Sequence, residues 1–391
     1  MLDPSVAMDI RTTTEFRGLN EFARITSELI FDKIAQTIPI GSGRHVLYHR
    51  LQGAIVKDFG ELGGAVDYEQ PIIVEQELRP TYQKGGLELP EAHFVDEGQM
   101  GKIGYAVAGD WAKDVAAAAA YWPQRALISL LRSAYTTTFQ TGPLYGRSFG
   151  NCYDGRPLFS VGHPYNFRRE SLGFFANLFT QGVLNDGRAV DITSTGYNTH
   201  PGFAPLAGPF GDGSAEITLA AAWDNLWTVI SYIRTIKMAD GVTPRFLRPT
   251  LIGGGPKLAK NLQMLTSAEF ISMNASTYGG GSTEIAGTIR KLGLNAPLIL
   301  DELGGNTDLD SDEDYDWYLF CEEQAKASSY GGLIYAPREP FDLKMFAATT
   351  GSTGVNIELA EKDAIKWITK GRSGVTVGLP QFLFKIQASR S

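Results

Sequence analysis

The residues best suited to chemistry are a cysteine, an aspartate and a histidine in a glycine-rich part of the chain. Cys152 and His163 lie eleven positions apart, with Asp154 between them. A thiol beside an imidazole that a carboxylate orients can act as a nucleophile, so a soluble Cys/His hydrolase is one interpretation. Cysteine is also a common small buried hydrophobe, and spacing along a chain does not establish geometry. We therefore expect no catalytic residue and keep the hydrolase as an alternative.

A run of acidic residues suggests cation binding. Residues 301–316 carry eight acidic and no basic side chains, and the aspartates from Asp308 to Asp312 alternate as in a calcium-binding loop. Such a loop needs glycine at its sixth position and glutamate at its twelfth, where this chain has Glu313 and Leu319. We expect an exposed acidic loop and no metal site, because closely packed carboxylates repel one another.

The glycine strings do not match cofactor-binding motifs. LIGGGPKLAKN and TYGGGSTE contain neither the phosphate-loop motif nor the dinucleotide fingerprint. The chain also has no hydrolase elbow, zincin helix or kinase motif set. We expect tight turns at these glycines, no cofactor and no enzyme.

Charge and cysteine content narrow the class of protein. The 391 residues carry 35 Lys and Arg against 43 Asp and Glu, a net charge of −8. The acidic run accounts for all of it, so no basic field is present to recognise nucleic acid phosphates. Two cysteines, Cys152 and Cys321, form neither a disulfide framework nor a zinc pattern, which favours a reducing compartment.

The first residues, MLDPSVAMDIRTTTEF, lack the basic and apolar regions of a signal peptide. No apolar run approaches the roughly 20 residues that cross a bilayer. We expect a soluble chain without membrane contact, export signal or cleaved propeptide.

Both helices and strands are expected among the elements that would position these residues. Periodicity predicts an amphipathic helix over 19–37, while residues 1–18 have no periodicity and need other surfaces to order them. Residues 60–98 read as a long polar hairpin, with Lys84, Gly85 and Gly86 at its tip because paired glycines suit a turn. The residues from 111 to 138 predict the longest helix, kinked or restarted at Pro123.

Periodic segments return after a glycine-rich stretch that ends at 213. A second helix is expected over 217–236, a strand over 245–254 and a further helix from Pro256. The apolar runs APLILDEL, DWYLFCE, GGLIYA and FDLKMFAA predict short buried strands. Helices and strands do not alternate strictly, which favours an α+β fold.

One segment carries a family resemblance. CYDGRPLFSVGHP, residues 152–164, resembles the hallmark of Mu-like major head subunits of tailed bacteriophages, in which a Tyr-Asp-Gly turn precedes a His-Pro. The matching residues are Tyr153, Asp154, Gly155, His163 and Pro164. The later segments WDNLWTVISYI, ADGVTPRFLRPTLIGGGPKLAKNLQMLTS, DWYLFCE and APREPFDLKMF are similar to the family in order more than in identity. The stretch from Arg168 to Gly213 and the acidic run look longer than the family core.

The resemblance implies the Hong Kong 97 type capsid fold. Its parts would be an N-terminal arm at 1–59, an extended E-loop hairpin at 60–98, a peripheral domain with a spine helix at 99–213, an axial domain at 214–360 and a return to the peripheral domain at 361–391. We hypothesise that Lys84, Gly85 and Gly86 contact a neighbouring subunit.

The resemblance also implies a function. The chain would be a major capsid protein that assembles in the host cytoplasm into pentamers and hexamers of an icosahedral virion head. That head would enclose double-stranded DNA without specific recognition, with separate scaffold and portal proteins and a decoration protein as a further candidate partner. A tail or baseplate structural protein is a further alternative.

Overall fold

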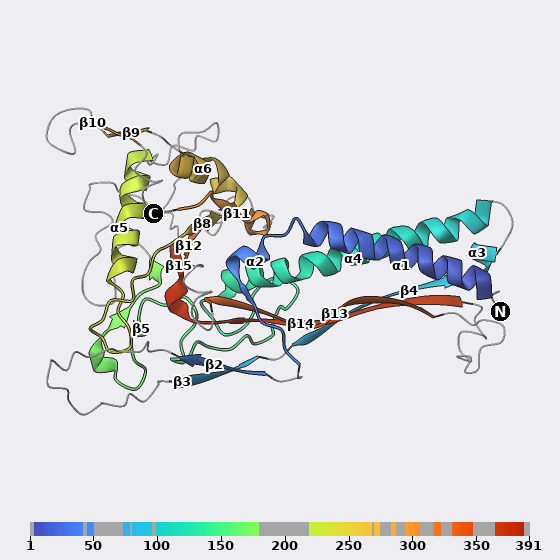
Figure 1. Cartoon of the computed structure of the whole chain (residues 1–391), viewed down its shortest axis with the longest axis horizontal. Helices are drawn as coiled ribbons and strands as arrows, with labels where there is room; N and C mark the ends of the chain where they lie inside the picture. Colours follow the sequence, from blue (N-terminus) through green and yellow to red (C-terminus); the bar gives the residue numbers. More distant parts are fainter. Residues whose placement is uncertain are drawn as a thin grey trace, which may run out of the picture.

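The computed structural model describes most of the chain, and helices and strands are mixed in it, which confirms the α+β expectation. The described residues are 4–41, 45–50, 73–78, 80–95, 99–179, 219–267, 270–273, 283–286, 294–304, 316–321, 331–346 and 364–386. The molecule is elongated, with two long helices over a sheet in one half and a second sheet with two further helices in the other (Figure 1). None of the helices described is long and apolar enough to cross a membrane.

The elongated half is built from two helices and four strands. Helices α1 (Pro4–Thr26) and α4 (Gln99–Ser133) lie side by side above the sheet (Figure 1). The strand order is β1-β13-β14-β4, in which only the β1–β13 pair is parallel. The strands are β1 (Gln36–Thr37), β13 (Leu333–Phe346), β14 (Ala364–Val377) and β4 (Thr81–Pro90). Short helices α2 (Phe31–Ile34) and α3 (Ala92–Val95) flank them.

Helix α4 is the longest described helix, as predicted, but it begins at Gln99 rather than near 111. Its first part contains glycines, which are poor helix formers, and tertiary packing accommodates them. A Cβ at Gly104 would overlap the carbonyl oxygen of His93. The helix continues through Pro123 without a break, so the predicted restart is wrong. Alanines four residues apart form its buried stripe: Ala108, Ala112, Ala116 and Ala120.

Helix α1 differs from the prediction over 19–37. It starts at Pro4 and ends at Thr26. Its buried residues lie on one face and contact α4 and β13, which supply the ordering that residues 1–18 need; they include Ile10, Thr14, Gly18 and Ile25. A Cβ at Gly18 would lie 3.1 Å from Leu343 Cδ2 and 3.3 Å from the carbonyl oxygen of Ala112, so the two helices and the sheet meet closely here.

The predicted hairpin tip is wrong. Lys84, Gly85 and Gly86 lie inside β4 and pair with residues of β14, opposite Lys370, Thr369 and Ile368. A Cβ at Gly85 would lie 3.0 Å from Thr369 Oγ1, so this glycine permits close approach instead of a turn. The antiparallel pair nearest the prediction is β2 (His45–Arg50) with β3 (Ile73–Leu78). Their connection, 51–72, lies outside the described residues.

The other half centres on a five-stranded sheet of order β11-β8-β12-β15-β7. The strands are β11 (Leu298–Ile299), β8 (Leu251–Gly254), β12 (Trp317–Phe320), β15 (Leu383–Ile386) and β7 (Leu178–Phe179). Trp317 and Leu319 belong to one core cluster with α5, while Tyr318 and Phe320 belong to another with the last turns of α4. Because side chains alternate along a strand, this sheet is buried on both faces.

The helices of this half match the sequence well. α5 (Leu219–Thr235) lies within the predicted 217–236, and α6 (Ala259–Ser267) follows a 3-10 turn at Pro256–Leu258. The remaining short elements are β5 (His163–Pro164), β6 (Phe174–Phe175), β9 (Phe270–Met273), β10 (Thr283–Ala286) and 3-10 turns at Glu170–Leu172, Asp301–Gly304 and Pro380–Phe382.

One later prediction needs correction. GGLIYA and FDLKMFAA were expected as separate strands, yet both belong to β13, because the bulges near Glu339 let pairing with β14 continue. The segment 361–391, for which a return to the peripheral domain stays a prediction, contributes strands to both sheets. Strand β14 lies in the elongated half, whereas β15 completes the five-stranded sheet. The domain boundaries themselves stay predictions.

Candidate functional site: a buried polar loop and an open groove

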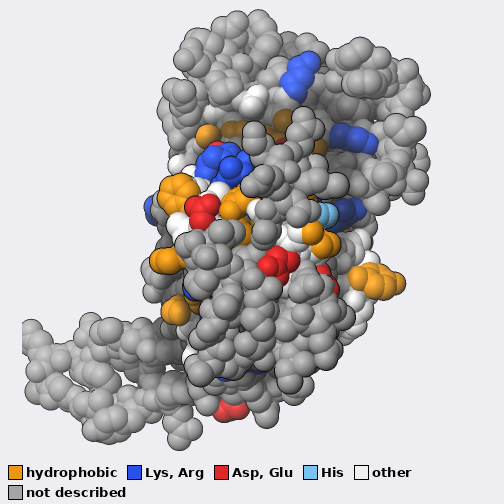
Figure 2. Space-filling view, turned by 90° about the vertical axis from the view of Figure 1, so that its right-hand side faces the viewer, with side chains coloured by type: hydrophobic (Ala, Val, Ile, Leu, Met, Phe, Trp, Pro, Cys, Tyr) orange, Lys and Arg blue, Asp and Glu red, His pale blue; other side chains and the backbone are white. Residues whose placement is uncertain are grey.

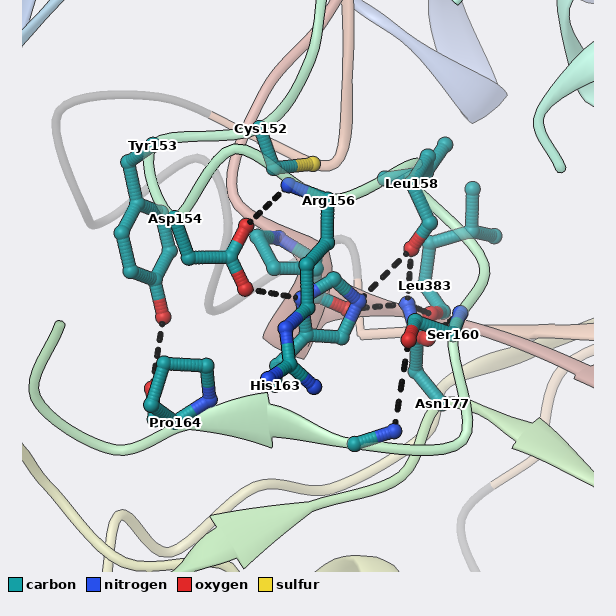
Figure 3. Close-up of polar contacts among 12 residues, drawn as sticks. Cys152, Tyr153, Asp154, Arg156, Leu158, Ser160, His163, Pro164, Asn177 and Leu383 are labelled. Carbon is teal, nitrogen blue, oxygen red and sulfur yellow. Dashed lines mark hydrogen bonds and ion pairs between the residues drawn. The ribbon is translucent and has the colours of Figure 1, made fainter. Parts of the chain in front are cut away.

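The histidine of the hallmark segment is fully paired. His163 Nδ1 lies 2.6 Å from Asp154 Oδ2, and its Nε2 lies 3.1 Å from the carbonyl oxygen of Leu158 (Figure 3). The side chains of His163 and Asp154 are both completely buried. Each ring nitrogen therefore lies within hydrogen-bonding distance of an acceptor of the same loop, and neither is left to serve another group.

A tight turn presents Asp154 to the histidine. Gly155 has a φ of +75°, a conformation that glycine adopts without steric cost. The amide of Cys152 donates to the carbonyl of Arg156 at 2.8 Å, and Asp154 Oδ1 accepts the Arg156 amide at 3.1 Å. Tyr153 closes the loop by donating its hydroxyl to the Pro164 carbonyl at 3.2 Å (Figure 3). The structure therefore brings the five hallmark residues together in one loop, with the side chains of Asp154 and His163 buried inside it.

Cys152 is not placed to be a nucleophile. Its Sγ lies 3.8 Å from the carbonyl oxygen of Gly378, and both nitrogens of His163 are engaged elsewhere. Burial first, and then the neighbouring Asp154 carboxylate, raise the pKa of the Cys152 thiol well above its ordinary value. A thiol that stays protonated in an apolar site is unreactive. The geometry contradicts the hydrolase interpretation.

Asn177 is a residue of this loop that sequence reasoning missed. Its side-chain amide donates to the carbonyls of Leu158 at 2.6 Å, Pro380 at 3.1 Å and Leu383 at 3.2 Å, and its Oδ1 accepts the Ser160 amide at 2.9 Å. It thus ties the loop to the C-terminal strand (Figure 3). A single asparagine inside the apolar run FFANLF was the available signal.

A second buried charge pair lies next to the loop. Lys385 Nζ, on β15, is 2.6 Å from Asp316 Oδ2 at the start of β12, and both side chains are only 1% exposed. The ammonium also lies 4.3 Å from the ring centre of Tyr135 and 5.5 Å from that of Tyr318. Charges so deeply buried are tolerated only when they are paired. Both polar clusters therefore act as structural connections within the subunit.

The elongated half has an open groove between its helices and its sheet. It encloses about 410 Å³ and is lined mainly by apolar side chains of α1, α4 and β13, among them Phe22, Val115, Trp122, Tyr335 and Phe341. Along the β4 and β14 wall lie three cations, Lys84, Lys370 and Arg372, with Glu339 on β13. Lys84 and Gly85 thus line a groove, although they form no hairpin tip.

One end of the molecule shows described charges of both signs. The end-on view in Figure 2 shows apolar, basic and acidic side chains interspersed on the described surface of that face. Within the described residues, no group of three or more His, Cys, Asp and Glu side chains is placed to hold a metal ion. The three aspartates from 308 to 312 lie outside the described residues, whereas Leu319 is buried in β12.

Comparisons with known proteins find likeness in structure only. No protein-family model matches the chain, and no curated protein matches it in sequence. Among solved structures, it is similar to a chain of the bacteriophage JBD30 procapsid, with 11% identity, a TM-score of 0.44 and coverage of 100% of this chain and 77% of that one.

Two further solved structures show the same degree of likeness. A chain of the bacteriophage PhiM1 mature capsid has 10% identity and a TM-score of 0.43, and one from Gordonia phage Cozz has 11% and 0.42. Each alignment covers 93% of this chain and 87% of the other. Likeness this remote does not assign the chain to a family, so its function has to be inferred from its own residues.

Proposed function

We propose that this chain is a major capsid protein of a tailed bacteriophage, with the Hong Kong 97 type fold, that self-assembles into pentamers and hexamers of an icosahedral head. The proposal rests on the hallmark segment 152–164, on the order of the elements and on the surface that a single subunit leaves uncovered. A function without catalysis agrees with the pairing of His163 and the buried, protonated thiol of Cys152.

The observation that carries the proposal is the open apolar groove in an extended subunit. Its walls come from α1, α4, β4, β13 and β14, so it runs along the elongated half and not into a closed core. Large apolar side chains are also exposed on this half, including Met8 at 71% and Phe16 at 65%. Contiguous exposed apolar surface marks sites of protein association. A shell subunit buries such surface against its neighbours, since obligate interfaces cover roughly 2,000 Å² or more.

We propose that the groove takes residues 51–72 of a neighbouring copy, the connection between β2 and β3. This segment contains apolar residues together with four acidic and one basic side chain. Among the described residues, the groove offers apolar walls, the cations Lys84, Lys370 and Arg372, and one acid, Glu339. Lys84, Gly85 and Gly86 then serve as an inter-subunit contact through β4. One surface meeting a different surface generates rings when the rotation closes.

Finer parts of the proposal follow from the sequence resemblance. We propose that the chain is related to Mu-like head subunits, that it assembles in the host cytoplasm and that it is located in the virion. The head would enclose double-stranded DNA, and its further partners would be separate scaffold, portal and decoration proteins. The net charge of −8 agrees with DNA that is enclosed without specific contacts.

Negative-stain electron microscopy of the purified chain, alone and with the phage's candidate scaffold protein, tests the proposal. Closed shells or rings of five and six subunits are expected. Tubes or small rings of other symmetry would favour a tail or baseplate protein. A monomer that stays dispersed at high concentration in both preparations would overturn the proposal.

A further inference from the structure

Helix α1 carries a mainly apolar stripe that is exposed among the described residues of the subunit. Met8 is 71% exposed, Phe16 65% and Leu19 51%. At 3.6 residues per turn, these side chains and the exposed Thr12 and Ala23 fall within about 80° of arc. The buried residues of the helix, such as Ile10 and Ile25, lie on the opposite face, against α4 and the sheet. The stripe is therefore the outward face of a helix whose inner face is already packed.

We propose that this stripe pairs antiparallel with the same stripe of a second copy. In a register that sets Met8 against Leu19 of the other copy, Thr12 and Phe16 also meet, so the apolar positions form closed layers. Such two-fold contacts are self-complementary, because each residue pair occurs twice. Spacings of three and four residues between these positions are those of helix-pairing seams.

Charges beside the stripe favour this register. Arg11 and Glu15 flank it and are paired within one helix at 2.8 Å, with Arg11 60% exposed. Antiparallel pairing sets Arg11 of one copy near Glu15 of the other, so both charges gain an opposite neighbour. Charge complementarity thus supports a second copy in the antiparallel direction.

The α1 contact is separate from the groove contact proposed above, and it rests on the same proposal that copies of this chain associate. The groove contact joins unlike surfaces, whereas the α1 contact is two-fold symmetric, and such a contact can link two rings. The expected partner is α1 of another copy of this chain.

Cysteine cross-linking tests the contact. The double variant Met8→Cys with Leu19→Cys should give a disulfide-linked dimer on a non-reducing gel under mild oxidation, while each single variant should not. Residues 8 and 19 are about 16 Å apart along one helix. A disulfide requires Cα atoms about 4.4–6.8 Å apart, so the dimer must join two chains. The native Cys152 and Cys321 are buried and do not compete.

Matched controls give every outcome a meaning. Met8→Cys with Arg24→Cys, an exposed position about 120° around the helix from the centre of the stripe, should stay monomeric on the gel. Glu15→Arg in the double-cysteine background should lower the dimer yield about fivefold, and adding Arg11→Glu should restore it. Absence of the dimer, or equal dimer from the single variants, would overturn the inference. Electron microscopy of the same samples separates the proposals, since shells without the dimer reject only the α1 contact and the dimer without shells rejects only the capsid function.

Discussion

Lys385 and Asp316 form a 2.6 Å ion pair between the C-terminal strand β15 and the start of β12, inside a core where both side chains are 1% exposed. Tyr135 of the segment after α4 lies 4.3 Å below the ammonium, so the pair touches three separate parts of the chain. The five-stranded sheet and the segment that follows helix α4 thus share one polar connection.

Breaking this pair should destabilise the subunit strongly. Asp316→Asn leaves an uncompensated buried ammonium and should lower the free energy of unfolding by about 3–5 kcal/mol. Replacing both partners with apolar residues, Asp316→Leu with Lys385→Met, should recover most of the loss because no charge remains buried. Chemical denaturation of the three proteins measures this. Equal stability of Asp316→Asn and the native chain would show that the pair is not formed.

The buried thiols should make the subunit less stable at alkaline pH. Burial raises the pKa of Cys152 above its ordinary value of 9.0, and burial raises that of Cys321 too. When the pKa of a thiol is higher in the folded than in the unfolded state, its contribution to stability is complete below the unfolded-state pKa. That contribution is lost as the pH rises from the unfolded-state pKa through the folded-state pKa. Unfolding experiments from pH 7 to 10 should show stability falling from about pH 9 upward.

The contribution of one thiol can be separated with Cys152→Ala. This variant should show a shallower alkaline loss than the native chain. Native protein should also resist iodoacetamide at pH 8 and react after unfolding. Rapid alkylation of Cys152 in the folded state would contradict its placement.

Close packing of α4 should make Gly104 intolerant of a side chain. Although alanine is the better helix former, Gly104→Ala would force its Cβ against the backbone oxygen of His93. We expect a loss of about 1–3 kcal/mol, as for other overpacked sites. Gly41→Ala is the matched control, since no atom lies within 4 Å of its added Cβ. A stable Gly104→Ala protein would mean that α3 and α4 do not meet there.

Reversing charge in the groove should affect assembly and not folding. Lys84→Glu and Lys370→Glu together replace two cations on the wall with acids, which should repel the acidic segment 51–72 of a neighbour. Shell yield should fall while the thermal midpoint of the unassembled subunit stays within about 2 °C. Lys113→Glu, on α4 outside the groove, is the control and should assemble normally. Unchanged shell yield in the double variant would remove the groove from the interface.

Local sequence determined the central part of α4, helix α5 and the buried strand β12, whereas it misplaced α1. The alanine run before Pro123 and the apolar spacing in 217–236 predicted α4 and α5 because helix propensity and periodicity act within a few turns. The run DWYLFCE indicated a strand buried on both faces, which β12 is. The hallmark residues from Tyr153 to Pro164 could be picked out from their order, although their contacts could not.

Tertiary structure decided the rest. Lys84, Gly85 and Gly86 suit a turn as well as a closely packed strand, and only the approach of Thr369 on β14 selects the strand. Lys385 and Asp316 are 69 positions apart in sequence, so nothing local pairs them. The contact forms because β12 and β15 are neighbours in one sheet. The protein interior has a low dielectric constant, so two charges buried there must be paired. Local preferences fix elements, while pairing between distant segments fixes which side chains come together.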